Sequence, residues 1–93
     1  METGKIQEFR ERANAYYSSK TPAHIITIKD SWINGFITSV EDLHFKVLDK
    51  INGIVRIHYI DIELFEEYRG PVSKLRLPPE IITAFELEEE KLK

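Results

Sequence analysis

Cysteine, long apolar runs and an excess of basic residues are all missing from this sequence. Without cysteine, the chain can form neither disulfides nor thiolate metal sites, and we expect a reducing, cytoplasmic location. No apolar run approaches the ~20 residues of a membrane-spanning helix, so we expect no association with a membrane. The N-terminal stretch METGKIQEFRER is too polar to be a secretory signal peptide.

Charge is spread unevenly along the chain, which has a formal net charge of −3. Residues 61–93 carry nine acidic and five basic side chains, whereas residues 20–60 carry four acidic and five basic ones and all three histidines. A protein that coats nucleic acid without sequence preference has a basic stripe, and this chain lacks one. Any nucleic-acid site must therefore be small and local.

What remains is the composition of a small folding domain, with 93 residues of which 42% are hydrophobic and 31% charged. The length is enough for one modest core, and we expect a single domain over residues 1–93. Apolar residues recur at steps of three and four near the N-terminus, which predicts an amphipathic helix over residues 5–17. This helix should end before Pro22, because the residue before a proline avoids helical angles.

From residue 23 to residue 66, apolar and polar side chains alternate with a period of two, which predicts a series of short strands. Asn52-Gly53 predicts a hairpin with a primed turn, since this pair tolerates the positive φ that such turns demand. Glu41-Asp42 predicts another chain reversal. The strands are expected at residues 23–29, 32–40, 43–49, 54–60 and 61–65.

Strands this short and evenly spaced favour a strongly bent, antiparallel, five-stranded small barrel over residues 23–66. Gly35 interrupts the second strand; either the strand bends there to close a barrel, or a ligand approaches the backbone. The fold class is therefore mostly β, with an N-terminal α-helix before the barrel. The C-terminal extension, residues 67–93, can form a short helix from about Glu80 to Leu87 after two prolines.

Two stretches of the predicted barrel carry a family pattern. GFI (residues 35–37) followed by DLHFK (residues 42–46) resembles the first signature of the Sm/LSm small barrels, whose fold Hfq shares, with one residue added to the turn. IHYIDIELF (residues 57–65) is similar to the frame of the second signature, with Asp61 on its acidic position. The resemblance covers residues 6–65 and implies an Sm-like barrel; SH3-like barrels share much of the pattern.

The signature motifs are nevertheless degenerate. Lys46 stands where the family has asparagine, and His58-Tyr59 stands where the family has arginine-glycine. In the family, those side chains build the pocket that holds a uridine or similar base on the inner rim of a ring. The resemblance therefore implies the fold more strongly than it implies the pocket.

By this resemblance, the candidate RNA-binding residues are His44, Lys46, His58 and Asp61. A base could stack on His44, while Lys46 or His58 would meet a phosphate or a base oxygen. Asp61 would accept a hydrogen bond or hold His58. The alternative is a set of ordinary exposed strand residues. The residues interpreted as structural, for the bend and the turns, are Gly35, Asp42, Asn52 and Gly53.

The sequence indicates neither a metal site nor an active site. His24, His44 and His58 lack the spacing and the acidic partners of a metal site. There is no nucleophile–histidine–acid arrangement, no glycine-rich phosphate loop and no isolated carboxylate pair in an apolar context. We therefore expect no enzymatic activity, no cofactor and no bound metal.

Two functions remain open at this stage. The first is an oligomeric Sm-like protein that binds single-stranded RNA at the candidate site. The second is a scaffold with the same barrel but no base pocket, which serves protein–protein assembly and contacts a partner through the acidic C-terminal segment. Unpaired edge strands tend to pair with another copy of the chain, so we expect a homo-oligomer. In the first case the copies would close into a ring, and in the second they would form a protein assembly.

Overall fold

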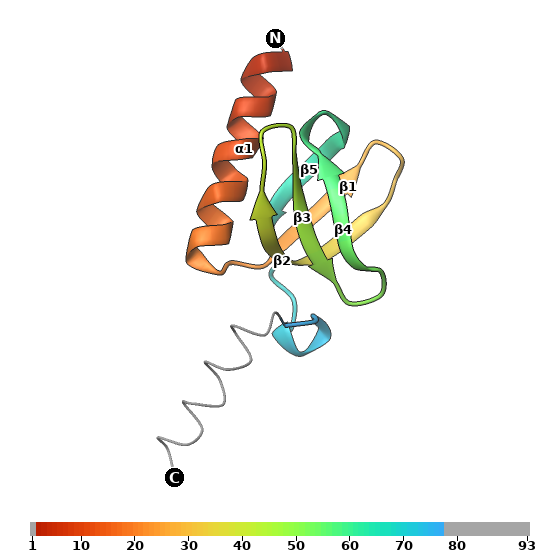
Figure 1. Ribbon diagram of the computed structural model, residues 1–93. Helices are drawn as coiled ribbons and strands as arrows, with labels where there is room; N and C mark the ends of the chain where they lie inside the picture. The colour runs from red at the N-terminus through yellow and green to blue at the C-terminus, as the bar shows by residue number, and fades with distance from the viewer. Residues whose placement is uncertain (1, 78–93) are drawn as a thin grey trace.

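The computed structural model describes residues 2–77 of the protein. One long helix is followed by five short strands and two short 3-10 helices (Figure 1). The elements in chain order are α1 (Glu2–Ser19), β1 (Ala23–Thr27), β2 (Trp32–Val40), β3 (His44–Asp49), β4 (Gly53–His58), η1 (Tyr59–Asp61), β5 (Ile62–Glu67) and η2 (Val72–Lys74). The predicted helix and the five predicted strands are confirmed, although α1 extends beyond residues 5–17 at both ends.

Two strands end earlier than the alternation of apolar residues predicted. Strand β4 ends at His58 because Tyr59–Asp61 form a 3-10 turn that leads into β5. This turn is tied to the β1–β2 connection, since the Ile28 N–H donates to the Asp61 carbonyl at 2.8 Å. Strand β1 ends at residue 27, and Asp30 adopts a positive φ of 63° in the turn that follows. Apolar alternation continues through both turns and therefore does not mark the strand ends.

The five strands form one antiparallel sheet in the order β4-β3-β2-β1-β5. The chain thus runs as a meander from β1 to β4, and β5 then returns to pair with β1. Within residues 2–77, no hydrogen-bonded pairing joins β4 to β5, so closure of the predicted barrel is not observed and the sheet has two free edges.

Aromatic rings stacked in the core show that this sheet is strongly bent. The ring centroids of Phe45 on β3 and Phe65 on β5 lie 5.2 Å apart with nearly parallel planes, and those of Phe45 and Tyr59 lie 5.5 Å apart. Two strands separate β3 from β5 in the sheet, so these rings can meet only if the sheet curls around them. The buried core residues are Ala13, Ala23, Ile25, Ile33, Ile37, Phe45, Val47, Ile57, Tyr59, Ile62 and Phe65.

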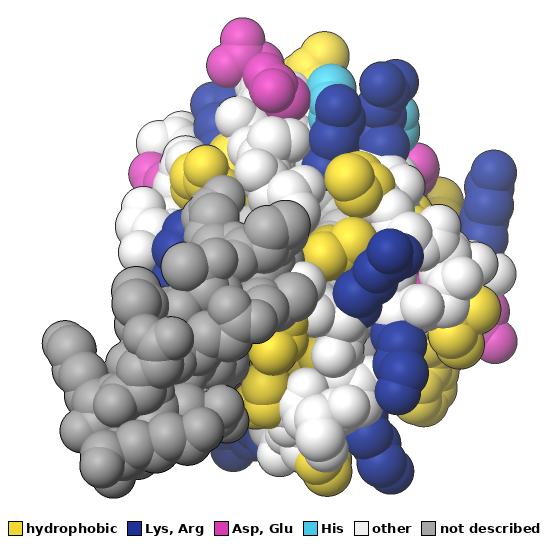
Figure 2. Space-filling model, turned by 60° about the horizontal axis from the view of Figure 1, so that its bottom comes forward, with side chains coloured by type: hydrophobic (Ala, Val, Ile, Leu, Met, Phe, Trp, Pro, Cys, Tyr) yellow, Lys and Arg dark blue, Asp and Glu magenta, His cyan; other side chains and the backbone are white. Residues whose placement is uncertain are grey.

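Other apolar side chains lie outside this core. Phe36 on β2 and Leu48 on β3 are cross-strand partners that are buried without belonging to the core cluster, and Leu75 after η2 is also buried. Figure 2 shows hydrophobic side chains between Lys and Arg on one face of the molecule. The predicted helix at residues 80–87 lies outside the described residues. The large exposed hydrophobic residues of the described chain are Tyr17, Ile28, Trp32, Leu43, Ile51, Ile54, Ile60, Leu64 and Val72.

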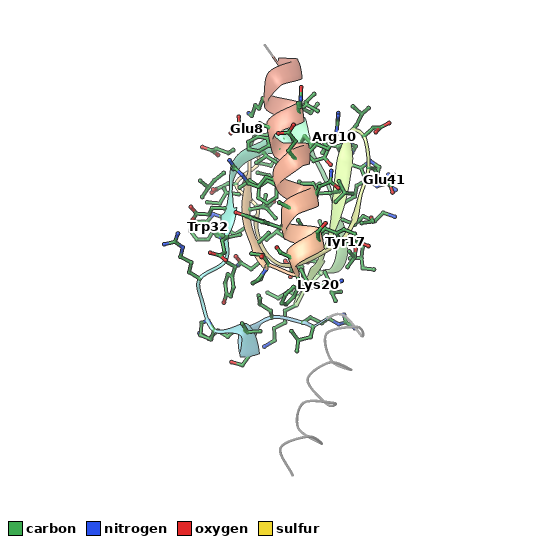
Figure 3. All side chains as sticks on the ribbon, turned by 90° about the vertical axis from the view of Figure 1, so that its left-hand side faces the viewer. Glu8, Arg10, Tyr17, Lys20, Trp32 and Glu41 are labelled. Atoms are coloured by element: carbon green, nitrogen blue, oxygen red, sulfur yellow. The ribbon has the colours of Figure 1, made fainter. Side chains whose placement is uncertain are left out.

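Helix α1 covers the core and is fixed to the sheet by aromatic contacts. Ala13 has no exposed surface, and the rings of Phe9 and Tyr16 lie 6.0 and 5.5 Å from the ring of Phe65. Figure 3 looks onto the helix and shows it lying across the strands. The chain leaves α1 through Lys20, whose φ of 57° ends the helix two residues before the proline that predicted this end.

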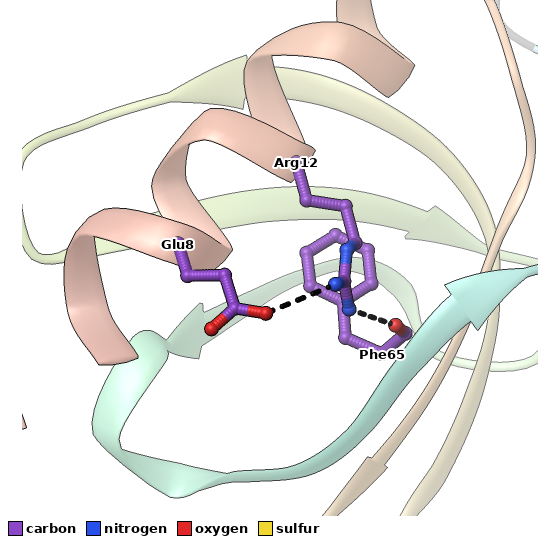
Figure 4. Close-up of polar contacts among 3 residues, drawn as sticks. All are labelled: Glu8, Arg12 and Phe65. Atoms are coloured by element: carbon purple, nitrogen blue, oxygen red, sulfur yellow. Dashed lines mark hydrogen bonds and ion pairs between the residues drawn. The ribbon is translucent and has the colours of Figure 1, made fainter. Parts of the chain in front are cut away.

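Arg12 adds a polar contact between α1 and β5 (Figure 4). One guanidinium nitrogen donates to the Phe65 carbonyl at 2.6 Å, and the other lies 3.3 Å from the Glu8 carboxylate. The guanidinium carbon also lies 5.8 Å from the Phe65 ring centroid and 5.7 Å from that of Phe9. A planar cation can stack on a ring while its edge donates hydrogen bonds, so Arg12 satisfies both contacts at once.

The β3–β4 turn has a different geometry from the predicted primed hairpin. Asp49 pairs with Gly53, so residues 50–52 form a three-residue loop, and from Asp49 to Gly53 only Gly53, at the start of β4, has a positive φ, of 75°. The Asp49 carboxylate accepts the N–H groups of Ile51 and Asn52 at 2.7 and 3.3 Å. A buried aspartate before the loop therefore stabilises a three-residue turn, in which glycine and not Asn52 supplies the left-handed conformation.

Gly35 occupies a position at which no residue with a Cβ atom fits. A Cβ atom on this residue would lie 2.0 Å from the carbonyl oxygen of Leu48 and 3.2 Å from a methyl group of Val47. Strand β3 therefore approaches β2 more closely than a larger residue would allow. This contact accounts for the glycine without a ligand.

Candidate nucleic-acid interface

Four basic side chains form two cross-strand pairs on β3 and β4. His44 lies opposite His58, and Lys46 lies opposite Arg56. Side chains two residues apart on a strand share a face, so all four point to the same side of the sheet. This is the side away from the core, because the intervening residues Phe45 and Ile57 are buried in it. The four residues are called the basic cluster below.

The basic cluster is partly open to solvent, and its two cations, Lys46 and Arg56, form no ion pair within the described residues. The two histidine rings lie 5.6 Å apart and are tilted by 55°. Arg56 and His58 are exposed, and His44 and Lys46 are half-buried. Within residues 2–77, no ion pair involves any of the four side chains. The face in Figure 2 shows Lys and Arg side chains in a line along one side, with histidine beside two of them at the upper edge.

A free hydroxyl group lies next to the basic cluster. Ser39 on β2 is the cross-strand partner of Lys46. Its Oγ atom is buried and has no hydrogen-bond partner among residues 2–77. A buried hydroxyl without a partner is costly, and because this atom has essentially no exposed surface it is not available to a ligand bound at the cluster.

The turns that flank the basic cluster are held against each other by hydrogen bonds. The Tyr59 N–H donates to the Leu43 carbonyl at 3.2 Å, and the Tyr59 hydroxyl donates to the Glu41 carbonyl at 2.8 Å. Helix α1 fixes the same turn, since Arg10 donates to the Asp42 carbonyl at 3.0 Å. Figure 3 shows Arg10 and Glu41 on the same side of the helix. The β2–β3 and β4–β5 turns therefore lie side by side.

Tyr59 is the group whose ionisation is most affected by this packing. Burial raises the pKa of the Tyr59 hydroxyl above its ordinary value of 10.0, and the charges of Asp42 and Glu41 raise this pKa further, while Arg10 lowers it. The hydroxyl therefore stays protonated at neutral pH and remains a hydrogen-bond donor. Its role is to hold the turn beside the cluster.

Asp61 shares a cleft with His58 but not with the other two predicted RNA-binding residues, His44 and Lys46. It lines a cleft of about 170 Å³ between the free edge of β4 and the β1–β2 turn, together with Lys29, Arg56 and His58. Within residues 2–77, no hydrogen bond or ion pair joins Asp61 to His58, so the carboxylate does not hold this histidine. The structure thus brings together His44, Lys46 and His58, and separates Asp61 from the first two.

Arg56 is the member of the cluster that the sequence motifs did not indicate. The family pattern draws attention to residues 57–65 and so stops one residue short of it. The alternation of β4 contains the missing signal, because Arg56 precedes His58 by two residues and faces the same way. Alternation along β4 alone puts Arg56 on the face of His58, but its pairing with Lys46 follows only from the strand register of the structure.

The sequence predicted neither a metal site nor a membrane-spanning helix. Among residues 2–77, no group of three or more histidine, aspartate or glutamate side chains is placed to hold a metal ion. His24 lies away from the other two histidines, and its Nδ1 atom is hydrogen-bonded to the Asn34 side-chain oxygen. In the same part of the chain, no helix is long and apolar enough to cross a membrane.

Comparison with known proteins gives no sequence relative, since neither a family model nor a curated protein matches the chain. The link to the Sm-like barrels therefore depends on topology and on the motifs themselves. An N-terminal helix followed by a five-stranded antiparallel sheet is consistent with the Sm-like topology.

Proposed function

We propose that this protein is an Sm-like protein that binds single-stranded RNA through the basic cluster and assembles into a homo-oligomer. The observation that carries the proposal is the pairing of His44 with His58 and of Lys46 with Arg56 on one exposed face. The Lys46 and Arg56 cations, which form no ion pair within residues 2–77, attract phosphate groups. Imidazole rings among them supply flat surfaces on which bases stack.

The chemistry of the cluster favours a single strand over a duplex. A duplex presents regularly spaced phosphates and hides its bases, so it would be met by a long basic stripe, which the charge distribution lacks. The cluster instead combines two cations with two rings over a few residues. This combination suits an unstacked base with its flanking phosphates.

The two free sheet edges support the assembly part of the proposal. Strands β4 and β5 each present an unpaired edge, and both expose hydrophobic residues, Ile54 and Leu64. In an antiparallel pairing, β4 of one copy would extend the sheet of the next copy at β5. Repetition of this contact closes a ring when the rotation between copies allows it, and several basic clusters would then act on one RNA.

A scaffold without RNA binding is the second candidate. The same free edges and the exposed hydrophobic residues on them favour it, because they promote protein–protein contacts whether or not RNA binds. Affinity for an oligonucleotide at low salt distinguishes the two candidates.

Titration of labelled oligo-U and oligo-A with the protein separates the two candidates. The wild type should bind at low salt, and the variant Lys46→Ala/Arg56→Ala should bind at least about tenfold more weakly, since each phosphate contact contributes to affinity. His44→Ala should weaken binding through lost stacking. Lys5→Ala, which removes a cation from α1, is the matched control and should bind as the wild type does. Absence of wild-type binding to either oligonucleotide would leave the scaffold.

A further inference from the structure

A second cleft, which shares no residue with the basic cluster, lies where β2, the β3–β4 turn and the segment after β5 meet. Its volume is about 210 Å³. It combines two aromatic rings, two lysines, an amide and a carboxylate. The lining residues are Trp32, Asn34, Asp49, Lys50, Ile51, Tyr68, Lys74 and Leu75.

Trp32 provides a large flat surface to this cleft. It is 64% exposed, although tryptophan is the side chain that gains most from burial. The ring of His24 packs edge-on against it at 5.7 Å, and the hydrogen bond from His24 to the Asn34 side chain fixes that histidine. The indole is therefore largely exposed while its contact with His24 restricts its movement, which favours its use as a stacking surface for a ligand.

Lys50 and Lys74 bring positive charge to the same cleft. Neither lysine takes part in an ion pair within residues 2–77. The one carboxylate in the lining, that of Asp49, is 5% exposed as a residue and already accepts two backbone N–H groups. The lysines are thus available to an anion from outside.

The remaining wall comes from the segment after β5, which is packed against the sheet. The Tyr68 N–H donates to the Pro22 carbonyl at 2.9 Å, and its hydroxyl donates to the Pro71 carbonyl at 3.3 Å. Gly70 allows this closure, because a Cβ atom there would lie 2.4 Å from the Tyr68 hydroxyl oxygen. Leu75 is buried at 7% exposure. The cleft therefore has a packed wall opposite the exposed indole.

We propose that this cleft binds a nucleotide, with the base stacked on Trp32 and the phosphate bound by Lys50 and Lys74. An exposed aromatic ring with two flanking cations matches a flat base that carries an anionic group. An aliphatic peptide would leave both lysines without a partner, and inorganic phosphate alone would leave the indole uncovered. The nucleotide is either free or one unit of a single-stranded RNA. The site stands or falls independently of the proposed function, because the basic cluster contributes no residue to it.

The chain contains a single tryptophan, so its fluorescence reports on this cleft alone. Uridine and adenosine 5′-monophosphate, the matching nucleosides, inorganic phosphate and short oligo-U and oligo-A serve as probes for titrations of the wild type. Nucleotides or oligonucleotides should quench the fluorescence at lower concentrations than nucleosides or phosphate. Quenching by both kinds of probe indicates a site for free nucleotides, and quenching by oligonucleotides alone indicates a unit of RNA; both support the proposal.

Variants then test the assigned roles. Stacking of one base is worth about 1–3 kcal/mol, so Trp32→Leu should weaken binding of a labelled probe by about 5- to 150-fold, whereas Trp32→Phe should recover part of this loss. Lys50→Ala and Lys74→Ala should each weaken quenching by the nucleotide but not by the nucleoside. Lys46→Ala/Arg56→Ala should leave quenching by mononucleotides unchanged, which separates this site from the basic cluster. Unchanged Trp32 fluorescence at millimolar nucleotide and saturating oligonucleotide, with the probe bound equally by Trp32→Leu, would overturn the proposal.

Discussion

At the scale of single residues, the fold depends on a few side chains whose environment leaves no substitute. Tyr59 is fully buried, yet its hydroxyl bridges to the Glu41 carbonyl and joins two turns next to the basic cluster. Gly35 has the opposite property, since the absence of a side chain lets two strands approach. Both residues can be tested by substitutions that change few atoms.

Replacing Tyr59 by phenylalanine should lower the free energy of unfolding by about 0.5–1.5 kcal/mol at neutral pH, because one buried hydrogen bond is lost. The folded-state pKa of Tyr59 is raised above its ordinary value of 10.0, so the folded protein holds this proton more tightly than the unfolded chain. The stability that this group contributes is thus present below pH 10 and is lost as the pH rises above it. Urea unfolding of both proteins at neutral pH and above pH 10 checks this. A stability difference between them that stays constant or grows over this range contradicts it.

Gly35→Ala should destabilise the protein by about 1–3 kcal/mol or more, because the added methyl group would meet the backbone of Leu48. Gly4→Ala is the matched control, since nothing lies within 4 Å of a Cβ atom at that position of α1. Alanine favours a helix over glycine by up to about 1 kcal/mol, so this control should be neutral or stabilising. Urea midpoints measure both changes, and equal effects of the two substitutions would show that the close strand approach is unimportant.

At the scale of secondary-structure elements, α1 and β5 are joined by Arg12 as well as by apolar packing. The short hydrogen bond to the Phe65 carbonyl has a charged donor, whereas the ion pair with Glu8 is largely exposed. Charge-assisted hydrogen bonds contribute about 1.5–3 kcal/mol, but exposed ion pairs between helix neighbours contribute only about 0.3–0.5 kcal/mol.

Arg12→Lys should therefore cost more stability than Glu8→Gln, although both weaken the same ion pair. Lysine keeps the charge but cannot stack on two rings while it donates to the Phe65 carbonyl, so we expect a loss of about 1–2 kcal/mol. Glu8→Gln should change stability by no more than about 0.5 kcal/mol. Thermal or urea unfolding of the two variants compares them directly. A larger effect of Glu8→Gln would mean that the ion pair, and not the contact with β5, stabilises the helix.

The elements also show what the sequence could predict. The spacing of apolar residues and the turn residues identified α1 and all five strands, because each element buries one face and therefore repeats its apolar residues at a regular interval. They failed at the β4–β5 connection, where Ile60 and Ile62 continue the alternation through a turn fixed by the contact of Asp61 with Ile28. They also failed for the turn after Asp49, whose type is set by a side chain outside the Asn-Gly pair.

The sequence predicted part of the candidate site and missed the part that depends on contacts between strands. Family motifs indicated His44, Lys46 and His58, which the structure places together. Arg56 was missed because its importance depends on its cross-strand partner, and strand register cannot be obtained from one sequence. The cleft beside Trp32 was missed because its wall comes from residues 68–75, which no motif links to β2.

At the scale of the whole molecule, the free edges of the sheet predict self-assembly. Light scattering coupled to gel filtration should give a mass that is a multiple of the 10.9 kDa chain. Ile54→Lys places a charge on the exposed edge strand β4 and should shift the mass toward the monomer. Ile51→Lys is the matched control, because Ile51 is 90% exposed in a turn and not on an edge strand. A monomeric wild type would contradict assembly in both candidate functions.

The most direct test of RNA binding by the basic cluster is the salt dependence of oligonucleotide affinity. For single strands, the logarithm of the binding constant falls with the logarithm of salt concentration by about 0.7 for each phosphate contact. If Lys46 and Arg56 each contact a phosphate, the variant Lys46→Ala/Arg56→Ala should bind more weakly than the wild type, with a slope that is shallower by about 1.4. Lys5→Ala should keep the wild-type slope. Equal affinities and equal slopes for the wild type and the double variant would contradict the role assigned to the cluster.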